Sequence, residues 1–178
     1  FIFPECHDFH RNPTKIAERF RDDHRDADLN ANKSRWTLTA TLPGIPMIFN
    51  GFEKLEWEPA SPFSYSKIDW EQDKDITQHI KRVNDIRHDE EALQRGTYTY
   101  LPVDVGVEQT SIFSFARQYE EETIIIAVNL DVNHGAAATI HTDSVGPIDE
   151  YSLRELQTGE EYQRSGNKLY VSLPPSEA

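Results

Sequence analysis

Two short apolar segments of this chain each end in polar side chains that could act on a substrate. The first, Phe1–Phe3, leads into His7, Asp8 and Arg11, which bring an imidazole, a carboxylate and a guanidinium close together. An ionised carboxylate can stabilise positive charge developing on a substrate, and a nearby Arg11 would keep Asp8 ionised. Residues spaced like Asp8 and Arg11 also commonly form plain loop salt bridges, so these residues alone leave both roles open.

The second apolar segment, Ile45–Phe49, ends in the same way at Asn50-Gly51-Phe52-Glu53. Parallel strands buried on both faces have continuous apolar sequences, and in β/α barrels the reactive residues follow the carboxyl ends of such strands. We therefore expect both polar groups at one rim. Glu53 could line that rim, or anchor it by accepting hydrogen bonds from backbone groups or an Arg.

Helices are expected between and after these two strands. Pro43-Gly44 is typical of a helix end and predicts a helix over about 30–42, although its three threonines weaken the prediction. A short helix over 14–20 and a charged surface loop over 21–28 are expected before it. A further helix is predicted over about 75–88 from apolar residues at helical spacing, with Asp75 and Gln78 forming a capping box.

The hydrophobic period changes beyond Gly96. Short β-rich segments follow at regular intervals, separated by Gly, Asn, Asp and Pro: Tyr98/Tyr100, Ile112–Phe115, Thr123–Leu130, Ala136–Ile140, Tyr151–Leu156 and Lys168–Leu173. This pattern predicts an antiparallel β-sandwich. The fold class is therefore α/β followed by all-β, with one domain over 1–95 and a second over 96–178.

The charge and composition of the chain exclude some classes of binding partner. The chain has 178 residues, 37% of them hydrophobic, and a net charge of −13 from 31 acidic and 18 basic residues. That excess of negative charge disfavours nucleic acid and an anionic membrane surface. No apolar run approaches the roughly 20 residues that span a bilayer. The single Cys6 excludes an internal disulfide, and nothing in the composition indicates a cellular compartment.

The strand-end motifs resemble the α-amylase family of glycoside hydrolases. The segment Phe3–Arg11 is similar to the family's Asn-His-Asp segment after the seventh barrel strand, with Arg three residues after the Asp. The segment Thr41–Glu53 is similar to the family's Leu-Pro-Gly segment around the eighth strand. An Ile-Asp-Trp stretch at Ile68–Trp70 and an Ile-Arg to Ala-Leu run over Ile86–Leu93 continue in the expected order.

The resemblance implies a fold and a set of roles. Residues 1–95 would be the last two β/α units of a TIM-type (β/α)8 barrel, and 96–178 the trailing β-sandwich. Asp8 would be the catalytic Asp that supports an oxocarbenium-like transition state, while His7, Arg11 and Glu53 would bind substrate. Cys6 stands where the family usually has Asn, so the local polar network must differ. A small buried side chain is expected there rather than a nucleophile.

The resemblance also implies what this chain lacks. A retaining glycosidase needs a nucleophilic carboxylate and a separate acid/base carboxyl, and in this family both come from earlier strands. We therefore expect a C-terminal fragment of an α-glucan-active glycosidase or transglycosidase that is inactive alone. Its partners would be an α-glucan or oligosaccharide substrate and the missing N-terminal part of the same protein. The alternative is a non-catalytic carbohydrate-binding or scaffold protein, which the Cys6 departure supports.

Two further segments have patterns that could indicate binding. Asp26 to Asn32 mimics the start of a calcium loop, but Ala31 and Thr37 stand where Gly and Glu are required, so no metal site and no cofactor is predicted. The Pro-rich stretch around Trp57, Phe63, Tyr65 and Trp70 is longer than an ordinary connection and is expected to be a pocket rim. Its aromatic residues could stack on sugar rings or form the loop's own small core.

Overall fold

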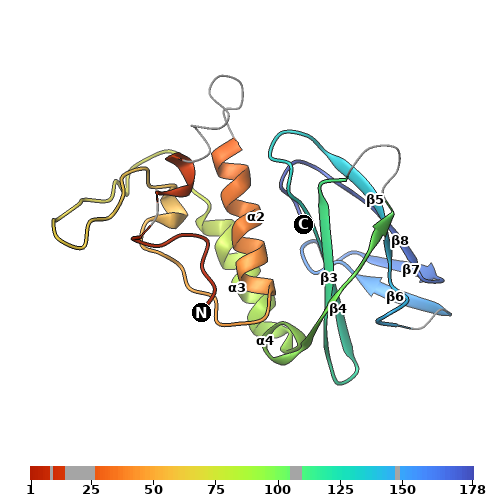
Figure 1. The fold of residues 1–178 in the computed structure, drawn as a ribbon. Helices are drawn as coiled ribbons and strands as arrows, with labels where there is room; N and C mark the ends of the chain where they lie inside the picture. The colour runs from red at the N-terminus through yellow and green to blue at the C-terminus, as the bar shows by residue number, and fades with distance from the viewer. Residues whose placement is uncertain (9, 15–26, 105–109, 147–148) are drawn as a thin grey trace.

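The computed structural model describes residues 1–8, 10–14, 27–104, 110–146 and 149–178 (Figure 1). Helices lie in the N-terminal part and strands in the C-terminal part, in the order α2, η1, α3, α4 and then β1 to β8. The helix expected over 14–20 lies almost wholly outside the described residues, as does most of the loop expected over 21–28.

Helix α2 spans Ala27–Thr41 and begins three residues earlier than predicted. Most of its length is buried, because α3 packs on one side of it and the strands β3 and β4 on the other. Its threonines are tolerated because their hydroxyls donate back to the helix: Thr37 to Lys33, Thr39 to Arg35 and Thr41 to Thr37. Each buried hydroxyl therefore has an acceptor, and the low helix propensity is overridden by packing.

Helix α3 spans Thr77–Asp89, and the short α4 spans Glu91–Arg95. The 3₁₀ turn η1, Phe52–Lys54, precedes them. One apolar cluster joins α2, η1 and α3: Trp36, Ala40, Phe52, Leu55, Ile76, Ile80 and Val83. The predicted capping box is wrong by one position, because Ile76 is the N-cap residue and makes no side-chain cap. The Asp75 carboxylate instead accepts a hydrogen bond from the Thr77 N–H at 2.6 Å.

The C-terminal part is sheet-rich, as the sequence predicts. Its strands are β1 Thr97–Tyr100, β2 Val103–Asp104, β3 Ile112–Tyr119, β4 Glu122–Asn129, β5 Ala136–His141, β6 Glu150–Arg154, β7 Glu161–Ser165 and β8 Lys168–Leu173. They form antiparallel sheets in the orders β1-β3-β4, β2-β5-β8 and β6-β7. Strands β2 and β7 were not anticipated, since one has only two residues and the other is mostly polar.

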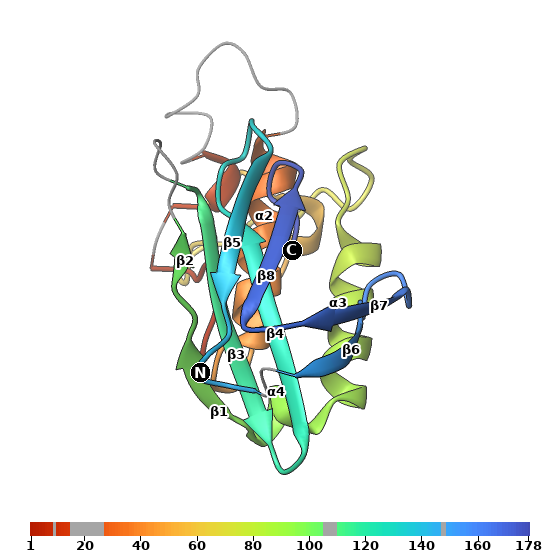
Figure 2. The same ribbon diagram turned by 90° about the vertical axis from the view of Figure 1, so that its right-hand side faces the viewer.

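The β1-β3-β4 sheet is a middle layer buried on both faces. Along β4, Ile126 and Val128 join the cluster that faces α2 and α4, whereas Ile125 and Ala127 face the β2-β5-β8 sheet. Figure 2 shows β5 and β8 lying in front of β3 and β4. This double burial explains why β4 is a continuous apolar run rather than an alternating one.

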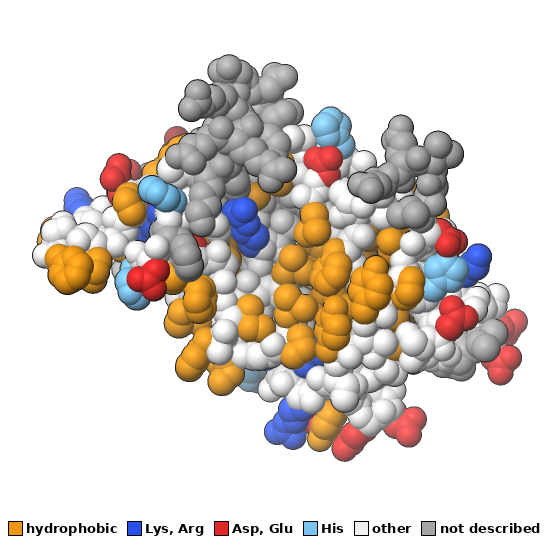
Figure 3. All heavy atoms as spheres, in the orientation of Figure 1, with side chains coloured by type: hydrophobic (Ala, Val, Ile, Leu, Met, Phe, Trp, Pro, Cys, Tyr) orange, Lys and Arg blue, Asp and Glu red, His pale blue; other side chains and the backbone are white. Residues whose placement is uncertain are grey.

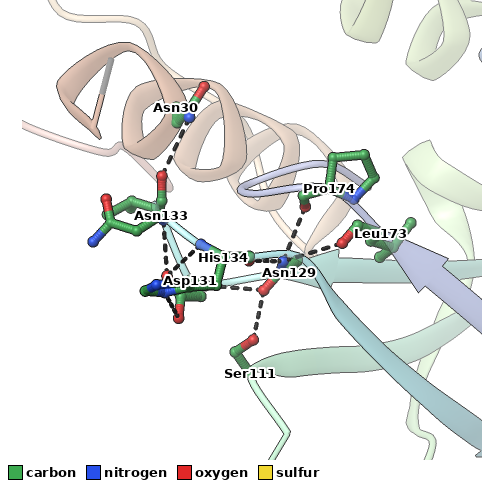
Figure 4. Close-up of polar contacts among 9 residues, drawn as sticks. Asn30, Ser111, Asn129, Asp131, Asn133, His134, Leu173 and Pro174 are labelled. Carbon is green, nitrogen blue, oxygen red and sulfur yellow. Dashed lines mark hydrogen bonds and ion pairs between the residues drawn. The ribbon is translucent and has the colours of Figure 1, made fainter. Parts of the chain in front are cut away.

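Asn129, at the end of β4, fastens the C-terminal tail to this sheet (Figure 4). Its amide donates to the carbonyls of His134 and Pro174 at 2.8 and 2.9 Å, and its Oδ1 accepts from Ser111 at 2.6 Å. The loop between β4 and β5 also contacts the helical part, where Asn30 of α2 donates to the Val132 carbonyl. The buried Asn129 amide thus satisfies backbone groups of two connections, the loop after β4 and the tail after β8.

Two arginines, the buried Arg117 and the half-buried Arg87, bind the C-terminus of α2. Arg117 of β3 donates to the Thr41 carbonyl at 2.7 Å and to the Gly96 carbonyl at 2.8 Å. Arg87 of α3 donates to the Ala40 carbonyl at 2.6 Å and to the Gly44 carbonyl at 2.9 Å. The last carbonyls of a helix have no partner within the helix, so these guanidinium groups supply one. They also fix the turn that leads into Ile45.

We expect Arg117→Met to lower the free energy of unfolding by about 3 kcal/mol, because the buried Thr41 carbonyl and the part-buried Gly96 carbonyl lose their donor. Urea unfolding followed by circular dichroism measures this. The matched control is Arg95→Met, whose side chain is 63% exposed and should change stability by less than about 0.5 kcal/mol. Equal losses of stability in the two variants would contradict the role of Arg117 in holding the end of α2.

The start of α3 should respond to acid. The Lys54 ammonium at 2.8 Å and the Thr77 N–H lower the pKa of Asp75 to about 2. Because the folded pKa lies below the unfolded value, this stabilisation is present at neutral pH and lost as pH falls from about 4 to about 2. We expect the stability difference between wild type and Asp75→Asn, below about 1 kcal/mol at this exposed site, to shrink over that interval in acid titrations. In a Lys54→Met background, the stability difference caused by Asp75→Asn should also be smaller. A stability difference that does not change with pH would contradict the lowered pKa of Asp75.

Candidate functional site

The two apolar segments pair in parallel, as expected for neighbouring strands. Ile2 N–H donates to the Ile45 carbonyl at 2.9 Å, and Met47 N–H donates to the Ile2 carbonyl at 2.8 Å. The pairing is a single parallel bridge between Ile2 and Pro46, so the full strands predicted over Phe1–Phe3 and Ile45–Phe49 are not formed. Because both segments run in one direction, the polar residues that follow them lie at the same end.

A buried ion pair joins these two polar ends. Glu5 Oε1 and Arg11 Nη1 are 2.5 Å apart, with side chains only 1% and 2% exposed. Arg11 also donates to the Asn50 carbonyl at 2.7 Å and the Glu58 carbonyl at 3.3 Å, while the second Glu5 oxygen accepts from the Asn12 N–H. A charge pair removed from water is stable only when its remaining donors and acceptors are satisfied, and here most of them are. The expected pairing of Arg11 with Asp8 is therefore wrong, since Glu5 takes that place.

His7 and Asp8 lie at the surface of this end. The Asp8 side chain is 70% exposed and its Oδ1 is 3.3 Å from His7 Nε2, whose ring is 54% exposed. The His7 ring centroid is 6.5 Å from that of Phe49, and the Arg11 guanidinium carbon lies 4.5 Å from the Phe49 ring centroid on the other strand. The Asp8 carboxylate and the His7 imidazole are thus open to solvent, whereas the nearby Arg11 guanidinium is buried.

Cys6, which precedes His7 in the sequence, is buried. Arg35 of α2 is a second guanidinium, and it lies within electrostatic range of the Glu5 carboxylate. Burial lowers the Arg35 pKa, and the Glu5 carboxylate opposes that effect. Glu5 therefore bonds directly to Arg11, whereas Arg35 interacts with it only electrostatically and has a buried Nη1 without a hydrogen-bond partner among the described residues.

Among the described residues, Glu53 makes no hydrogen bond or ion pair with His7, Asp8 or Arg11. It is in η1, where its carbonyl accepts a hydrogen bond from the Ile76 N–H at 2.9 Å. Its Oε2 is buried without a hydrogen-bond partner among the described residues. Gly51, just before η1, has a left-handed φ of 86°, and an added Cβ would lie 3.1 Å from the Glu56 Cβ. The sharp turn after Asn50 therefore needs glycine both for its dihedral angle and for its close approach.

Glu56 organises the long irregular segment, a role that the sequence did not reveal. One buried carboxylate oxygen accepts from the Trp57 and Glu58 N–H groups at 2.8 and 2.9 Å. The other accepts from the Asp69 N–H at 3.2 Å. One side chain thereby holds together the two ends of the segment 57–69, which we call the clasped loop. The only sequence signal was an acid next to Trp57, which has no distinctive spacing.

A cavity of about 220 Å³ lies beside this clasp. It is lined by Arg11, Phe49, Asn50, Glu56, Glu58, Ala60, Ser66, Lys67 and Ile68. Of the four predicted site residues, only Arg11 lines it. The walls come from Arg11 of the first polar segment and from residues between Phe49 and Ile68, so two distant parts of the sequence meet at this end of the parallel pair.

Two further findings concern ions and membranes. Within residues 1–8, 10–14, 27–104, 110–146 and 149–178, no group of three or more His, Cys, Asp or Glu side chains is arranged to hold a metal ion. In the same ranges, no helix combines the length and apolarity needed to cross a bilayer.

The chain is similar to enzymes of the α-amylase family. A beta/alpha-amylase of Paenibacillus polymyxa is 25% identical over 92% of this chain and 16% of the relative, and a cyclomaltodextrinase of Geobacillus thermopakistaniensis is 27% identical over 83% of this chain and 24% of the relative. A Geobacillus thermoleovorans α-amylase solved in complex with acarbose has a TM-score of 0.75 and 24% identity, covering 97% of this chain and 36% of that structure. No protein-family model matches.

The predicted resemblance to the α-amylase family is thus confirmed. The relatives and structural neighbours are α-amylase-family enzymes, and the match is with a C-terminal region of them. The chain spans about a sixth to a quarter of the length of these two curated relatives and about a third of the matching structure.

We expect Arg11→Met to destabilise the protein by about 3–5 kcal/mol, because it leaves the Glu5 carboxylate buried without its closest partner. The double change Glu5→Met with Arg11→Met should cost clearly less than the sum of the two single changes, since it removes both charges together. Urea unfolding of the wild type, the two single variants and the double variant measures the coupling energy between Glu5 and Arg11. Additive effects would show that the ion pair does not join the two polar ends.

Proposed function

We propose that this chain is the C-terminal part of a retaining enzyme acting on α-glucans. Residues 1–95 would form the last two β/α units of its catalytic (β/α)8 barrel, and residues 96–178 its trailing β-sandwich domain. The observation that carries the proposal is the parallel bridge between Ile2 and Pro46, with polar residues following both segments at one end. Side chains at the carboxyl ends of neighbouring parallel strands are where barrel enzymes carry their chemistry.

Asp8 is assigned the role of the transition-state-stabilising carboxylate. Cleavage of a glucosidic bond develops positive charge at the anomeric carbon, and a fixed anion that grips nearby hydroxyls lowers that barrier. Its exposure and its position beside His7 suit contact with a substrate, and His7 would donate hydrogen bonds to sugar hydroxyls. The exposed imidazole and carboxylate offer a donor and an acceptor to adjacent hydroxyl groups.

Arg11 and Glu53 receive supporting roles in this proposal. Arg11 was expected to bind substrate directly, but its side chain is 2% exposed and its donors reach Glu5, Asn50 and Glu58. We therefore assign it to positioning the loop that carries His7 and Asp8. Glu53, with its backbone bonded to Ile76 and one oxygen buried, suits anchoring of the rim better than substrate contact.

The nucleophile and the acid/base carboxyl would come from another part of the intact protein. A retaining mechanism places those two groups about 5–5.5 Å apart on either side of the scissile bond. The covalent intermediate can react with water or with a second sugar, so hydrolysis and transfer use the same residues. The relatives include both a cyclomaltodextrinase and a maltosyltransferase. We therefore propose α-glucosidic substrates without choosing between these outcomes, and no turnover by this chain alone.

A second candidate function is a non-catalytic carbohydrate-binding protein with an amylase-like fold. It is favoured by Cys6, which replaces an amide with a weakly polar thiol beside the polar strand end and is buried there. Such a protein would bind glucan without cleaving it. Assays of the intact protein on starch, maltooligosaccharides and trehalose separate the two candidates, because binding without product formation supports only the second.

We expect Asp8→Asn in the intact protein to lower kcat by about two to three orders of magnitude, because several kcal/mol of transition-state stabilisation are lost. Product release from maltooligosaccharides measures this. Folding should be unchanged within about 0.5 kcal/mol, since the side chain is largely exposed. Asp89→Asn, at the exposed end of α3, is the control and should retain full activity. Full activity of Asp8→Asn would overturn the assignment.

A further inference from the structure

An uncharged aromatic patch at the start of the sheet-rich part carries a further inference, which rests on the proposed function. We infer that this patch, formed by Tyr98, Tyr100 and Phe113, is the interface for the helix that precedes the Phe1 segment in the intact protein. Tyr98 and Tyr100 belong to β1, and Phe113 belongs to β3. Figure 3 shows hydrophobic side chains gathered over the sheet beside the helical part.

The aromatic patch is open to solvent on its outer side and packed against the core on its inner side. Tyr98 is 41% exposed, Tyr100 is 53% exposed and Phe113 is half-buried. The ring centroids of Tyr98 and Phe113 lie 5.3 and 5.5 Å from that of the fully buried Phe115. The Tyr100 centroid lies 6.3 Å from that of Phe113. Because the rings already rest on one another, little side-chain freedom is lost when a partner covers them.

The aromatic patch continues an interface that the structure already forms. Phe113 packs against the same apolar cluster as Leu38 and Leu42 of α2. Tyr100 stands opposite Phe115 in the β1–β3 register, so the tyrosines of β1 point to the sheet face that α2 covers. Among the described residues, no strand pairs with the outer edge of β1. A helix laid over β1 would extend the layer begun by α2 and would protect that edge.

The position of the aromatic patch identifies the helix that would cover it. In a β/α barrel the helices surround the strands in chain order, so the helices before and after α2 lie on its two sides. Helix α3, which follows α2, packs on one of these sides. Figure 2 shows β1 toward the other side of α2, where the N-terminal residue also lies. The helix that leads into Phe1 would therefore run beside α2 and over the patch.

The chemistry of the aromatic patch suits an apolar helix face. Residues 97–103 and 110–116 contain no charged side chain, although 28% of the whole chain is charged. Contiguous exposed apolar surface of this kind marks a contact with another polypeptide face. Apolar side chains at helical spacing would cover the rings, while the tyrosine hydroxyls could stay in the wet rim of the interface.

Hydroxyl-radical footprinting of the intact protein, read by mass spectrometry, tests whether the patch is covered. The matched control is Tyr170, which is 66% exposed on β8. We expect Tyr98 and Tyr100 to be oxidised several-fold more slowly than Tyr170, because the preceding helix shields them. An uncovered patch would instead give all three tyrosines similar oxidation rates, and that result would overturn the interface.

The same measurement separates other occupants of the patch. Light scattering at each protein concentration distinguishes monomer from dimer, and protection is expected in the monomer without added sugar. Protection found only in a dimer would assign the patch to a second copy, and protection found only with added maltooligosaccharide would assign it to a glucan. Either result overturns the inference. Turnover is scored separately: a protected patch in a protein without glucan turnover would overturn the catalytic proposal and retain the interface.

A charge substitution provides a second readout in the intact protein. We expect Tyr100→Glu to lower the Tm by about 5 °C, because it places a carboxylate in an apolar interface. Tyr170→Glu makes the same change on an exposed strand position and should shift the Tm by less than about 1 °C. Equal Tm values for the two variants would contradict a covered Tyr100. Footprinting of the wild type decides the question if Tyr100→Glu does not fold.

Discussion

The buried pair between Glu5 and Arg11 is the interaction on which the candidate site depends. Neither charge can be removed from water without compensation, so each draws polar groups from other segments toward it. Arg11 gathers the carbonyls of Asn50 and Glu58, and Glu5 gathers the Asn12 N–H. Two strand ends and the start of the clasped loop are thereby locked together, and His7 and Asp8 are held at the surface above them.

A second constraint connects this end to the rest of the molecule. Helix α2 is covered by α3 and η1 on one side and by the β1-β3-β4 sheet on the other. Its C-terminal carbonyls are taken by Arg87 and Arg117, which belong to those two layers. The turn at Gly44, and hence the second apolar segment, is positioned by the same guanidinium of Arg87. The sheet-rich part thus helps to place the second apolar segment through Arg117, which binds the end of the helix that precedes it.

The clasped loop shows how one carboxylate can shape a surface. Its connection is long and lacks regular secondary structure, so its backbone N–H groups need acceptors from elsewhere. Glu56 supplies them at both ends of the loop while its Cβ packs against the turn at Gly51. The exposed Phe63 and Tyr65 rings of this loop form no core for it. Local order here comes from polar satisfaction rather than from hydrophobic burial.

The sequence alone determined the order of elements, the change from helices to strands near Gly96, and the family resemblance. These depend on local periodicity and on motifs whose residues are close in the chain. The tertiary structure decided which charges meet: Glu5 rather than Asp8 pairs with Arg11, and Glu56 closes a loop that no spacing announced. Ion pairs and backbone acceptors join residues distant in sequence, and burial selects among several carboxylates of equal local plausibility. Only the folded chain makes that selection, because desolvation is a property of position and not of residue type.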